Sequence, residues 1–418
     1  MQTNGRGNPP LFASTTMRKR QVLRKVLTKI TGNGTVKPSI KRQNVSKHCF
    51  WIRVSFEKAS VTQLENNNHH ASYHTQIARE RTVRLRELSR QLPACCSDFF
   101  RGLEPTTSIL TRLNYAYDLR VFFDYLCKEE ADYGGYTRED WTDAAIATIT
   151  PIVLERFLEY LNYYASEDGK THGNGNTGKA RKISTLKSFF KYMYKKERIP
   201  ANVAEKIDMP KVHEKPIVHL EPDEVAKLLD LVESGDALTA AQKRYHAYTR
   251  TRDVAICTLL LGTGIRISEL VGLDIQHLDF SADSFLVTRK GGAQVVLYFG
   301  EEVEKALLDY LEERKAITPA PGHENALFLS LQKKRMSQRA IQMLVKKYAA
   351  IVTPLKKITP HKFRSTFGTM LNYETGDIYL VADVLGNKDV NTTRRHYAAL
   401  SDDRRRQAAG VVKLREDD

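Results

Sequence analysis

The residue types that could act on a phosphodiester gather near the C-terminal end of the chain. His361 precedes Arg364 by three positions, so a helix would place both on one face, where they could approach a single oxyanion. Tyr397 follows, beside Arg394 and Arg395. A phenol has a pKa of about 10 and needs a base or cationic neighbours to act as a nucleophile. The group suits attack on a phosphate by tyrosine; a basic helical bundle with a surface tyrosine is the alternative.

Two helices are predicted to position this group. Apolar residues at helical spacing predict a helix that ends at Gly376, and a second apolar run, residues 378–385, ends at Gly386. The spaced apolar residues of the first helix are Phe363, Phe367, Met370 and Leu371.

A second candidate lies upstream at Arg266, in the stretch LLLGTGIRISEL. The apolar run 255–261 breaks at Gly262 and Gly264 before apolar residues resume, so Arg266 is expected to be largely buried. A buried arginine requires an anionic partner. Glu269 would supply a structural ion pair, and a bound phosphate is the functional alternative.

Two β-prone runs, residues 285–288 and 295–299, bracket RKGGAQ and predict a hairpin. Lys290 would stand at its tip beside two glycines, where a lysine is ordinarily solvated.

In their order, these elements resemble the catalytic domain of the tyrosine recombinases. The resemblance spans about Leu220 to Tyr397. Most members have histidine, sometimes tryptophan, after the LG pair, and this chain departs from that pattern. The elements are Arg266 in TGIRISEL, Lys290 on a glycine-containing hairpin, HxxR at His361 and Arg364, LGN ending in Asn387, and Tyr397.

The resemblance implies a mainly α fold with a small β-hairpin or sheet, in which a helical core-binding domain and a catalytic domain form a two-domain DNA clamp. It implies site-specific strand exchange: Tyr397 attacks a phosphodiester to give a 3′-phosphotyrosyl intermediate, without cofactor or metal. Arg266 and Arg364 would hold the phosphate oxygens, and Glu269 would orient Arg266 or His361.

The remaining roles concern proton transfer and DNA contacts. Lys290 would protonate the departing 5′-oxygen, and His361 would take or share the proton of the tyrosine. Asn387 can donate an amide hydrogen bond but cannot carry a proton. Arg394 and Arg395 are candidates for contacts with flanking DNA.

The positive charge of the chain is uneven. Residues 1–60 hold 13 Lys and Arg and a single acid, Glu57, so +12 of the formal net charge of +16 lies there. Residues 1–75 therefore read as a basic extension that is disordered or binds arm-type DNA sites.

After the basic extension, four segments are expected. They are a helical core-binding domain (76–206), a linker (207–219), a catalytic domain (220–400) and a tail (401–418). In the first domain, segments 108–127, 152–164 and 183–194 have apolar faces at helical spacing. Basic residues interleave with aromatics along the last of them, which suits a phosphate backbone, with a solvated face as the alternative. The candidate DNA-binding residues there are Lys179, Arg181, Lys187 and Lys191.

The stretch GNGNTGKA, residues 173–180, comes near a P-loop, but Ala180 offers no hydroxyl for magnesium and no strand is expected before it. It is interpreted as a loop. Five cysteines without CxxC spacing suggest reduced thiols, and no apolar run approaches a membrane span. These features favour a cytosolic protein, and the resemblance implies a bacterial cytoplasmic protein associated with the nucleoid.

The expected partners are duplex recombination sites and a directionality factor, and the chain is expected to act as a homo-tetramer on synapsed DNA. The expected role is the integration and excision of a mobile element. Alternatives are an Xer-like chromosome-dimer resolvase, a type IB topoisomerase, and a DNA-binding relative with a weakened active site.

Overall fold

The computed structural model describes residues 73–166, 169–212, 217–289, 292–387 and 390. Four of the predicted site residues, Lys290, Arg394, Arg395 and Tyr397, lie outside the described residues. So do residues 1–72 of the basic extension and the tail 401–418.

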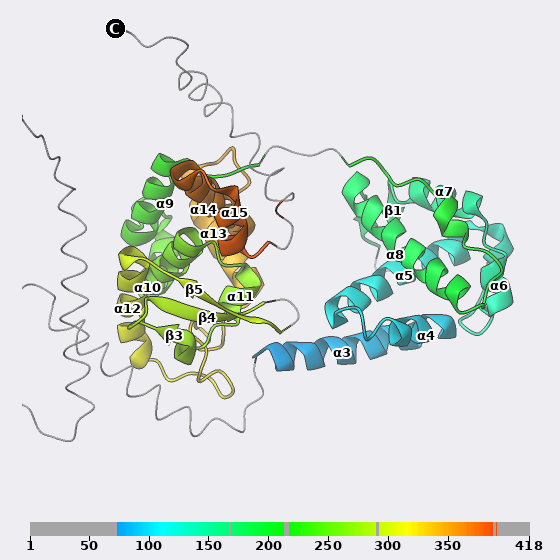
Figure 1. Cartoon of the computed structure of the whole chain (residues 1–418), viewed down its shortest axis with the longest axis horizontal. Helices are drawn as coiled ribbons and strands as arrows, with labels where there is room; N and C mark the ends of the chain where they lie inside the picture. Colours follow the sequence, from blue (N-terminus) through cyan, green and yellow to red (C-terminus); the bar gives the residue numbers. More distant parts are fainter. Residues whose placement is uncertain (1–72, 167–168, 213–216, 290–291, 388–389, 391–418) are drawn as a thin grey trace, which may run out of the picture. The chain divides into compact units, whose positions relative to one another are not determined.

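The first part of the described chain consists of helices and one short β-ribbon (Figure 1). The two strands of the ribbon pair antiparallel, with Tyr164 opposite His172. The elements are α3 (Tyr73–Gln91), α4 (Ala94–Gly102), α5 (Ile109–Glu129), η1 (Ala131–Tyr133), α6 (Asp143–Ala147), α7 (Pro151–Tyr160), β1 (Tyr164–Ala165), β2 (Thr171–His172), α8 (Asn176–Lys195) and η2 (Val203–Lys206).

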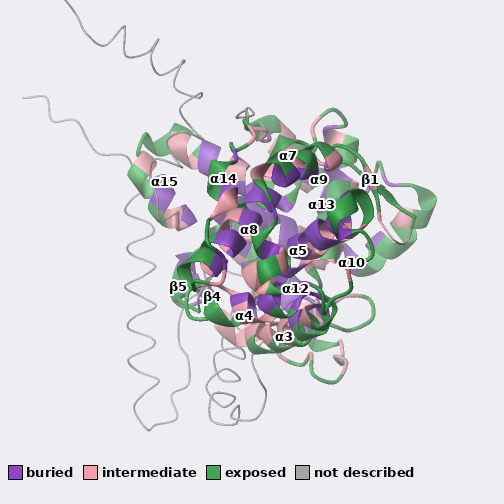
Figure 2. Ribbon diagram, turned by 90° about the vertical axis from the view of Figure 1, so that its right-hand side faces the viewer, coloured by how far each residue is buried: buried purple, intermediate pink, exposed green. Residues whose placement is uncertain are grey.

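One buried apolar cluster holds this part together. The central helix α5 starts at Ser108, whose hydroxyl accepts a hydrogen bond of 3.2 Å from the main-chain N–H of Thr111 and so caps the helix. Phe122 from α5, Phe157 from α7 and Phe189 from α8 are completely buried. Side chains from distant segments thus share one core, while α8 keeps its other face exposed (Figure 2).

Three local predictions in this part are wrong. Helix α7 ends at Tyr160, not at residue 164, because the chain turns there into β1. The stretch 173–180 is only partly a loop: α8 begins at Asn176, after the extended residue Gly175. Asparagine and glycine are tolerated in a first helical turn, where main-chain donors have no intrahelical partner. The short strand β2 also precedes this stretch, where no strand was expected.

The second part combines helices with a three-stranded sheet. The strand order is β3-β4-β5, and both pairings are antiparallel. The elements are α9 (Pro222–Ser234), α10 (Ala240–Thr263), α11 (Ile267–Val271), η3 (Ile275–His277), β3 (Leu278–Asp279), β4 (Ser284–Thr288), β5 (Gln294–Tyr298), α12 (Glu301–Lys315), α13 (Gln338–Val352), α14 (Pro360–Thr375) and α15 (Ile378–Leu385).

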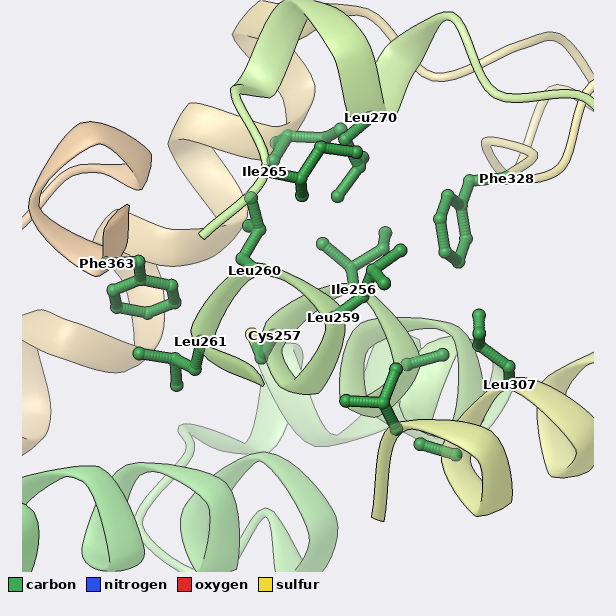
Figure 3. Packing of buried hydrophobic residues seen from close by; sticks show 14 of the residues in the cluster. Ile256, Cys257, Leu259, Leu260, Leu261, Ile265, Leu270, Leu307, Phe328 and Phe363 are labelled. Carbon is green, nitrogen blue, oxygen red and sulfur yellow. The ribbon is translucent and has the colours of Figure 1, made fainter. Parts of the chain in front are cut away.

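The centre of this part is α10. All residues from Ala255 to Leu261 are buried, because other elements cover the helix on every side. In Figure 3, Phe363 of α14 lies on one side of α10, and Leu307 of α12 and Phe328 lie on the other.

The helix continues through Gly262, where a break was predicted. A Cβ at this position would lie 2.6 Å from Cγ2 of Val303, so the glycine allows α10 and α12 to pack closely. The helix ends at Gly264, whose φ of 61° lies in the left-handed region.

The predicted hairpin is confirmed as β4 and β5, with Ser284 opposite Tyr298 and Thr288 opposite Gln294. The helices that were predicted to end at Gly376 and Gly386 are confirmed as α14 and α15. The mainly α fold with a small sheet is therefore confirmed. Among the residues that the structure describes, no helix has the length and apolar character that a bilayer crossing requires.

Candidate active site

Arg266 stands where the chain leaves α10 and starts α11. Its main-chain N–H donates to Oε2 of Glu269 at 3.1 Å, and its Nη1 donates to Oε1 of the same carboxylate at 2.9 Å. The carboxylate is the buried member of the pair: the side chain of Arg266 is 35% exposed and that of Glu269 4%. Arg266 is therefore partly buried, and its partner Glu269 is the more deeply buried residue because the first turn of α11 points its third residue inward.

Arg364 is the buried arginine of the site, with 7% of its surface exposed. It lies in the second turn of α14, and its Nη1 donates to the carbonyl oxygen of Gly264 at 2.6 Å. Its Nη2 donates to the carbonyl oxygen of Leu385. Both acceptors are helix-end carbonyls, which lack intrahelical donors.

The two arginines meet at the end of α15. Nη2 of Arg266 donates to the carbonyl oxygen of Gly386 at 3.2 Å, and Arg364 binds the preceding carbonyl, that of Leu385. Two guanidinium groups from helices far apart in the sequence are thereby held at one turn. The site combines the α10–α11 connection, α14 and the end of α15.

Two other predicted residues flank this turn. Asn387 follows Gly386, and its main-chain N–H donates to the carbonyl oxygen of Ala382 at 2.9 Å, which fixes its position after the helix. His361 lies in the first turn of α14, one turn before Arg364, and is exposed. The site therefore presents the imidazole toward solvent and the Arg364 guanidinium toward the protein.

Sequence reasoning missed Arg289, the residue before Lys290. Its guanidinium lies against Gly386, so closely that a Cβ at Gly386 would overlap it. The sequence offered only one signal, a second basic residue beside the predicted hairpin tip.

The basic face of α8 is a separate feature. Lys191 and Arg181 are exposed, but Arg181 is also ion-paired with Asp118, a carboxylate only 2% exposed. Lys179 donates to Oδ1 of Asn162 at 2.7 Å, and Lys187 is half-buried. These contacts give two of the four candidate DNA-binding residues a structural partner.

Asp118 also lies beside a buried lysine, Lys182. Burial lowers the pKa of this lysine, and the nearby Asp118 carboxylate opposes that effect. Thr185 donates to the same carboxylate at 2.8 Å. The cluster anchors α8 to α5, so it explains why Arg181 is held in place along the basic face.

Comparison with known proteins identifies the family. Residues 219–404 match the family model described as "Phage integrase family". A tyrosine recombinase XerC of Caldanaerobacter subterraneus subsp. tengcongensis is 32% identical over 308 residues, which cover 72% of this chain and 80% of that protein. The chain belongs to the tyrosine recombinase family. It is a site-specific DNA recombinase. A XerC of Thermodesulfovibrio yellowstonii is 31% identical over 249 residues, 59% of this tyrosine recombinase and 76% of its relative.

Solved structures share the fold of this tyrosine recombinase. The XerH site-specific recombinase bound to palindromic difH substrate, a post-cleavage complex, superposes with a TM-score of 0.56 at 18% identity, over 90% of this chain and 99% of that chain. The Tn1549 transposon integrase in complex with transposon right end DNA gives a TM-score of 0.55 at 18% identity, over 76% of this chain and 98% of that one. The mainly α fold with a small sheet is therefore the fold that this chain shares with these recombinases.

Proposed function

We propose that this recombinase cuts and rejoins duplex DNA through a covalent bond between Tyr397 and a 3′-phosphate. The convergence of Arg266 and Arg364 on the Leu385–Gly386 turn supports this proposal. Guanidinium groups present N–H donors in a fixed fork that matches phosphate oxygens, and their charge stabilises the additional negative charge of a pentacoordinate transition state.

The reaction conserves phosphoester bonds. The phenol oxygen of Tyr397 attacks phosphorus while its proton passes to His361, and the bond from phosphorus to the 5′-oxygen breaks as Lys290 donates a proton to that oxygen. The products are a phosphotyrosine and a 5′-hydroxyl, and a hydroxyl from the partner strand reverses the step. Because each broken ester is replaced by another, no nucleotide hydrolysis is needed.

Two residues support the phosphate site without taking a proton. Asn387 donates an amide hydrogen bond to a non-bridging oxygen. Glu269 holds the main chain and the guanidinium of Arg266 through both of its oxygens, which agrees with a positioning role.

The proposed substrate is a pair of synapsed duplex sites bound by a homo-tetramer, with the basic face of α8 and residues 394–395 on the DNA backbone. Residues 76–206 act as the core-binding domain and residues 220–400 as the catalytic domain. The biological role is integration and excision of a mobile element in the bacterial cytoplasm, with a directionality factor.

A second role is favoured by a specific observation. The curated relatives at 32% and 31% identity are both named tyrosine recombinase XerC, which supports chromosome-dimer resolution. A recombination assay on two plasmids separates the roles. Exchange between the ends of the element that holds the gene supports integration, whereas exchange only at a chromosomal site of the host supports resolution.

The experiment that tests the chemistry uses the full chain and nicked duplexes tiled across the DNA that flanks its gene. A nick beside the cleavage position lets the short 5′-hydroxyl strand diffuse away, so the covalent adduct accumulates and is seen on a denaturing gel. The Tyr397→Phe variant is the matched control. Absence of adduct with every duplex that the protein binds tightly would contradict the proposed function.

A further inference from the structure

Arg289 is fixed by the closure of the β4–β5 hairpin. Its main-chain N–H donates to the carbonyl oxygen of Ala293 at 2.7 Å, and its carbonyl oxygen accepts from the N–H of Gly292 at 3.1 Å. These bonds continue the strand pairing beyond Thr288, so the sheet fixes the direction in which the side chain of Arg289 leaves the backbone.

The side chain lies on the turn at the end of α15. Its guanidinium covers Gly386, where a Cβ would overlap it. Gly386 also has a φ of 61°, in the region that residues with a Cβ rarely adopt. Glycine is therefore needed at this position for two reasons, the helix end and the room for a guanidinium.

One donor of the Arg289 side chain, Nε, is unmatched among the described residues. This nitrogen is buried, and no ion pair with a described carboxylate holds the guanidinium. A buried donor without an acceptor is unfavourable, because it loses its hydrogen bonds to water. Arg266 and Arg364, by contrast, donate to carbonyl oxygens of the same turn. The side chain of Arg289 is thus arranged for an acceptor that comes from outside the described chain.

The positive charge around the turn indicates which kind of acceptor would bind Arg289. Three guanidinium groups, those of Arg266, Arg289 and Arg364, surround Leu385 and Gly386. The carboxylate of Glu269 pairs with Arg266. Like charges held this close repel one another, and an anion between them removes the repulsion. Asn387, the next residue, offers only a neutral amide.

We propose that Arg289 is a third phosphate-binding arginine, which donates to a non-bridging oxygen of the scissile phosphate. This inference rests on the proposed function, since the anion is the phosphate that Tyr397 attacks. Gly386 is the positioning residue for Arg289, because its missing side chain lets the guanidinium lie over the turn that Arg266 and Arg364 also bind.

The test compares two DNA substrates that differ in charge at the cleavage position. A methylphosphonate replaces one non-bridging oxygen by a methyl group and removes the negative charge that the arginine would bind. On ordinary DNA, Arg289→Ala should lower adduct formation on the order of 10²-fold, as for loss of one preorganised donor. On the methylphosphonate, the same variant should be within a few-fold of the parent. An equal loss on both substrates would overturn the proposal.

Two variants give the matched controls. Arg244→Ala removes an exposed arginine near the start of α10. At 1.5 Å per residue, Arg244 lies about 28 Å along the helix from Thr263, the end of α10 that adjoins the site. This variant should leave the rate of adduct formation unchanged on both substrates. Arg289→Lys keeps the charge but loses the fork of donors, so it should recover only part of the lost rate. If Arg289→Lys recovers none of the rate that Arg289→Ala loses, a cationic contact with the phosphate is excluded and the proposal fails.

A third substrate separates phosphate binding from an effect on the neighbouring Lys290. A 5′-bridging phosphorothiolate has a thiolate leaving group that needs no proton, so it should rescue Lys290→Ala but not Arg289→Ala. Rescue of both would mean that Arg289 acts through the hairpin, which contradicts a direct phosphate contact. A full chain that forms no adduct contradicts the proposed function as well, whereas an active chain with a fully active Arg289→Ala variant contradicts this inference alone.

A final readout measures folding. Because the side chain of Arg289 makes no hydrogen bond or ion pair with another described residue, and the alanine variant keeps the main-chain bonds, Arg289→Ala should not lower Tm. Gly386→Ala should lower both Tm and cleavage, and its effect on cleavage should shrink in the Arg289→Ala background, where the overlapping side chain is gone. Additive effects of the two substitutions on cleavage would contradict the proposal that Gly386 positions the guanidinium of Arg289.

Discussion

Arg266 and Gly386 are joined by a hydrogen bond of 3.2 Å from Nη2 to the carbonyl oxygen, although 120 residues separate them in the sequence. The bond connects the start of α11 to the end of α15. The position of one guanidinium at the candidate phosphate site therefore depends on a helix end that is formed much later in the chain.

Glu269 should matter for both folding and cleavage. Glu269→Ala removes the acceptor for the main chain and the guanidinium of Arg266, and we expect a loss of about 1–3 kcal/mol in the free energy of unfolding, measured in urea. Glu269→Gln retains one acceptor and should lose less. Glu312→Ala, which breaks an exposed pair with Lys315, is the control and should change the free energy by less than about 0.5 kcal/mol. Equal losses for Glu269→Ala and the control would show that the buried carboxylate is dispensable.

Asn387 should act as a hydrogen-bond donor and not as a proton carrier. Asn387→Ala should lower cleavage on the order of 10²-fold, because one donor to the phosphate is lost. Asn387→His should retain or raise cleavage, since imidazole also presents an N–H. The shape of the pH profile of cleavage should be the same for Asn387→Ala and the parent. An alanine variant with full activity would place this side chain away from the phosphate.

Periodic and local features of the site could be predicted from the sequence. The spacing of Phe363 and Phe367 predicted α14, and Gly376 its end, because these signals arise within one helix. The hairpin followed from β-prone runs around two glycines for the same reason. Local chemistry also suggested the pairing of Arg266 with Glu269, which lies one turn away.

Contacts between distant segments could not be predicted in this way. The contact between Arg289 and Gly386 depends on the packing of the sheet and α15, and neither segment alone has a pattern that indicates it. Gly262 was interpreted as a helix break because glycine has a low helix propensity, but close packing against Val303 of α12 overrides that propensity. The deeper burial of Glu269 compared with Arg266 likewise follows from how α11 leaves α10.

Cleavage should survive EDTA. The arginines at residues 266 and 364 are proposed to stabilise the phosphate charge that a metal ion stabilises in other phosphoryl-transfer sites. The rate of adduct formation should therefore be the same with EDTA and with added Mg²⁺, at matched ionic strength because DNA binding depends on salt. Loss of cleavage that only Mg²⁺ restores would contradict this division of roles.

Tyr348 should contribute to unfolding at alkaline pH. It is fully buried and donates to Oδ2 of Asp253 at 3.0 Å. Burial raises the pKa of this phenol, and the Asp253 carboxylate raises it further. The folded chain therefore keeps the proton that the unfolded chain loses above a pH of about 10, so this stabilisation is complete below that pH and is lost as the pH rises.

The measurement is the free energy of unfolding in urea as a function of pH. Above a pH of about 10, Tyr348→Phe should make the decline shallower by about 1.4 kcal/mol per pH unit, the value for one proton. Tyr298→Phe alters an exposed tyrosine of β5 and should leave the slope unchanged. The same slope in the parent and Tyr348→Phe would be evidence against a buried phenol that holds its proton.

The central claim, that Tyr397 becomes covalently joined to DNA, is tested most directly by finding the residue that carries the adduct. The full chain is trapped on a nicked duplex, both polymers are digested, and the nucleotide-bearing peptide is sequenced by mass spectrometry. We predict a 3′-phosphodinucleotide on Tyr397, and no modified peptide from Tyr397→Phe. A nucleotide on any other residue, or an adduct that persists in the phenylalanine variant, would contradict the account.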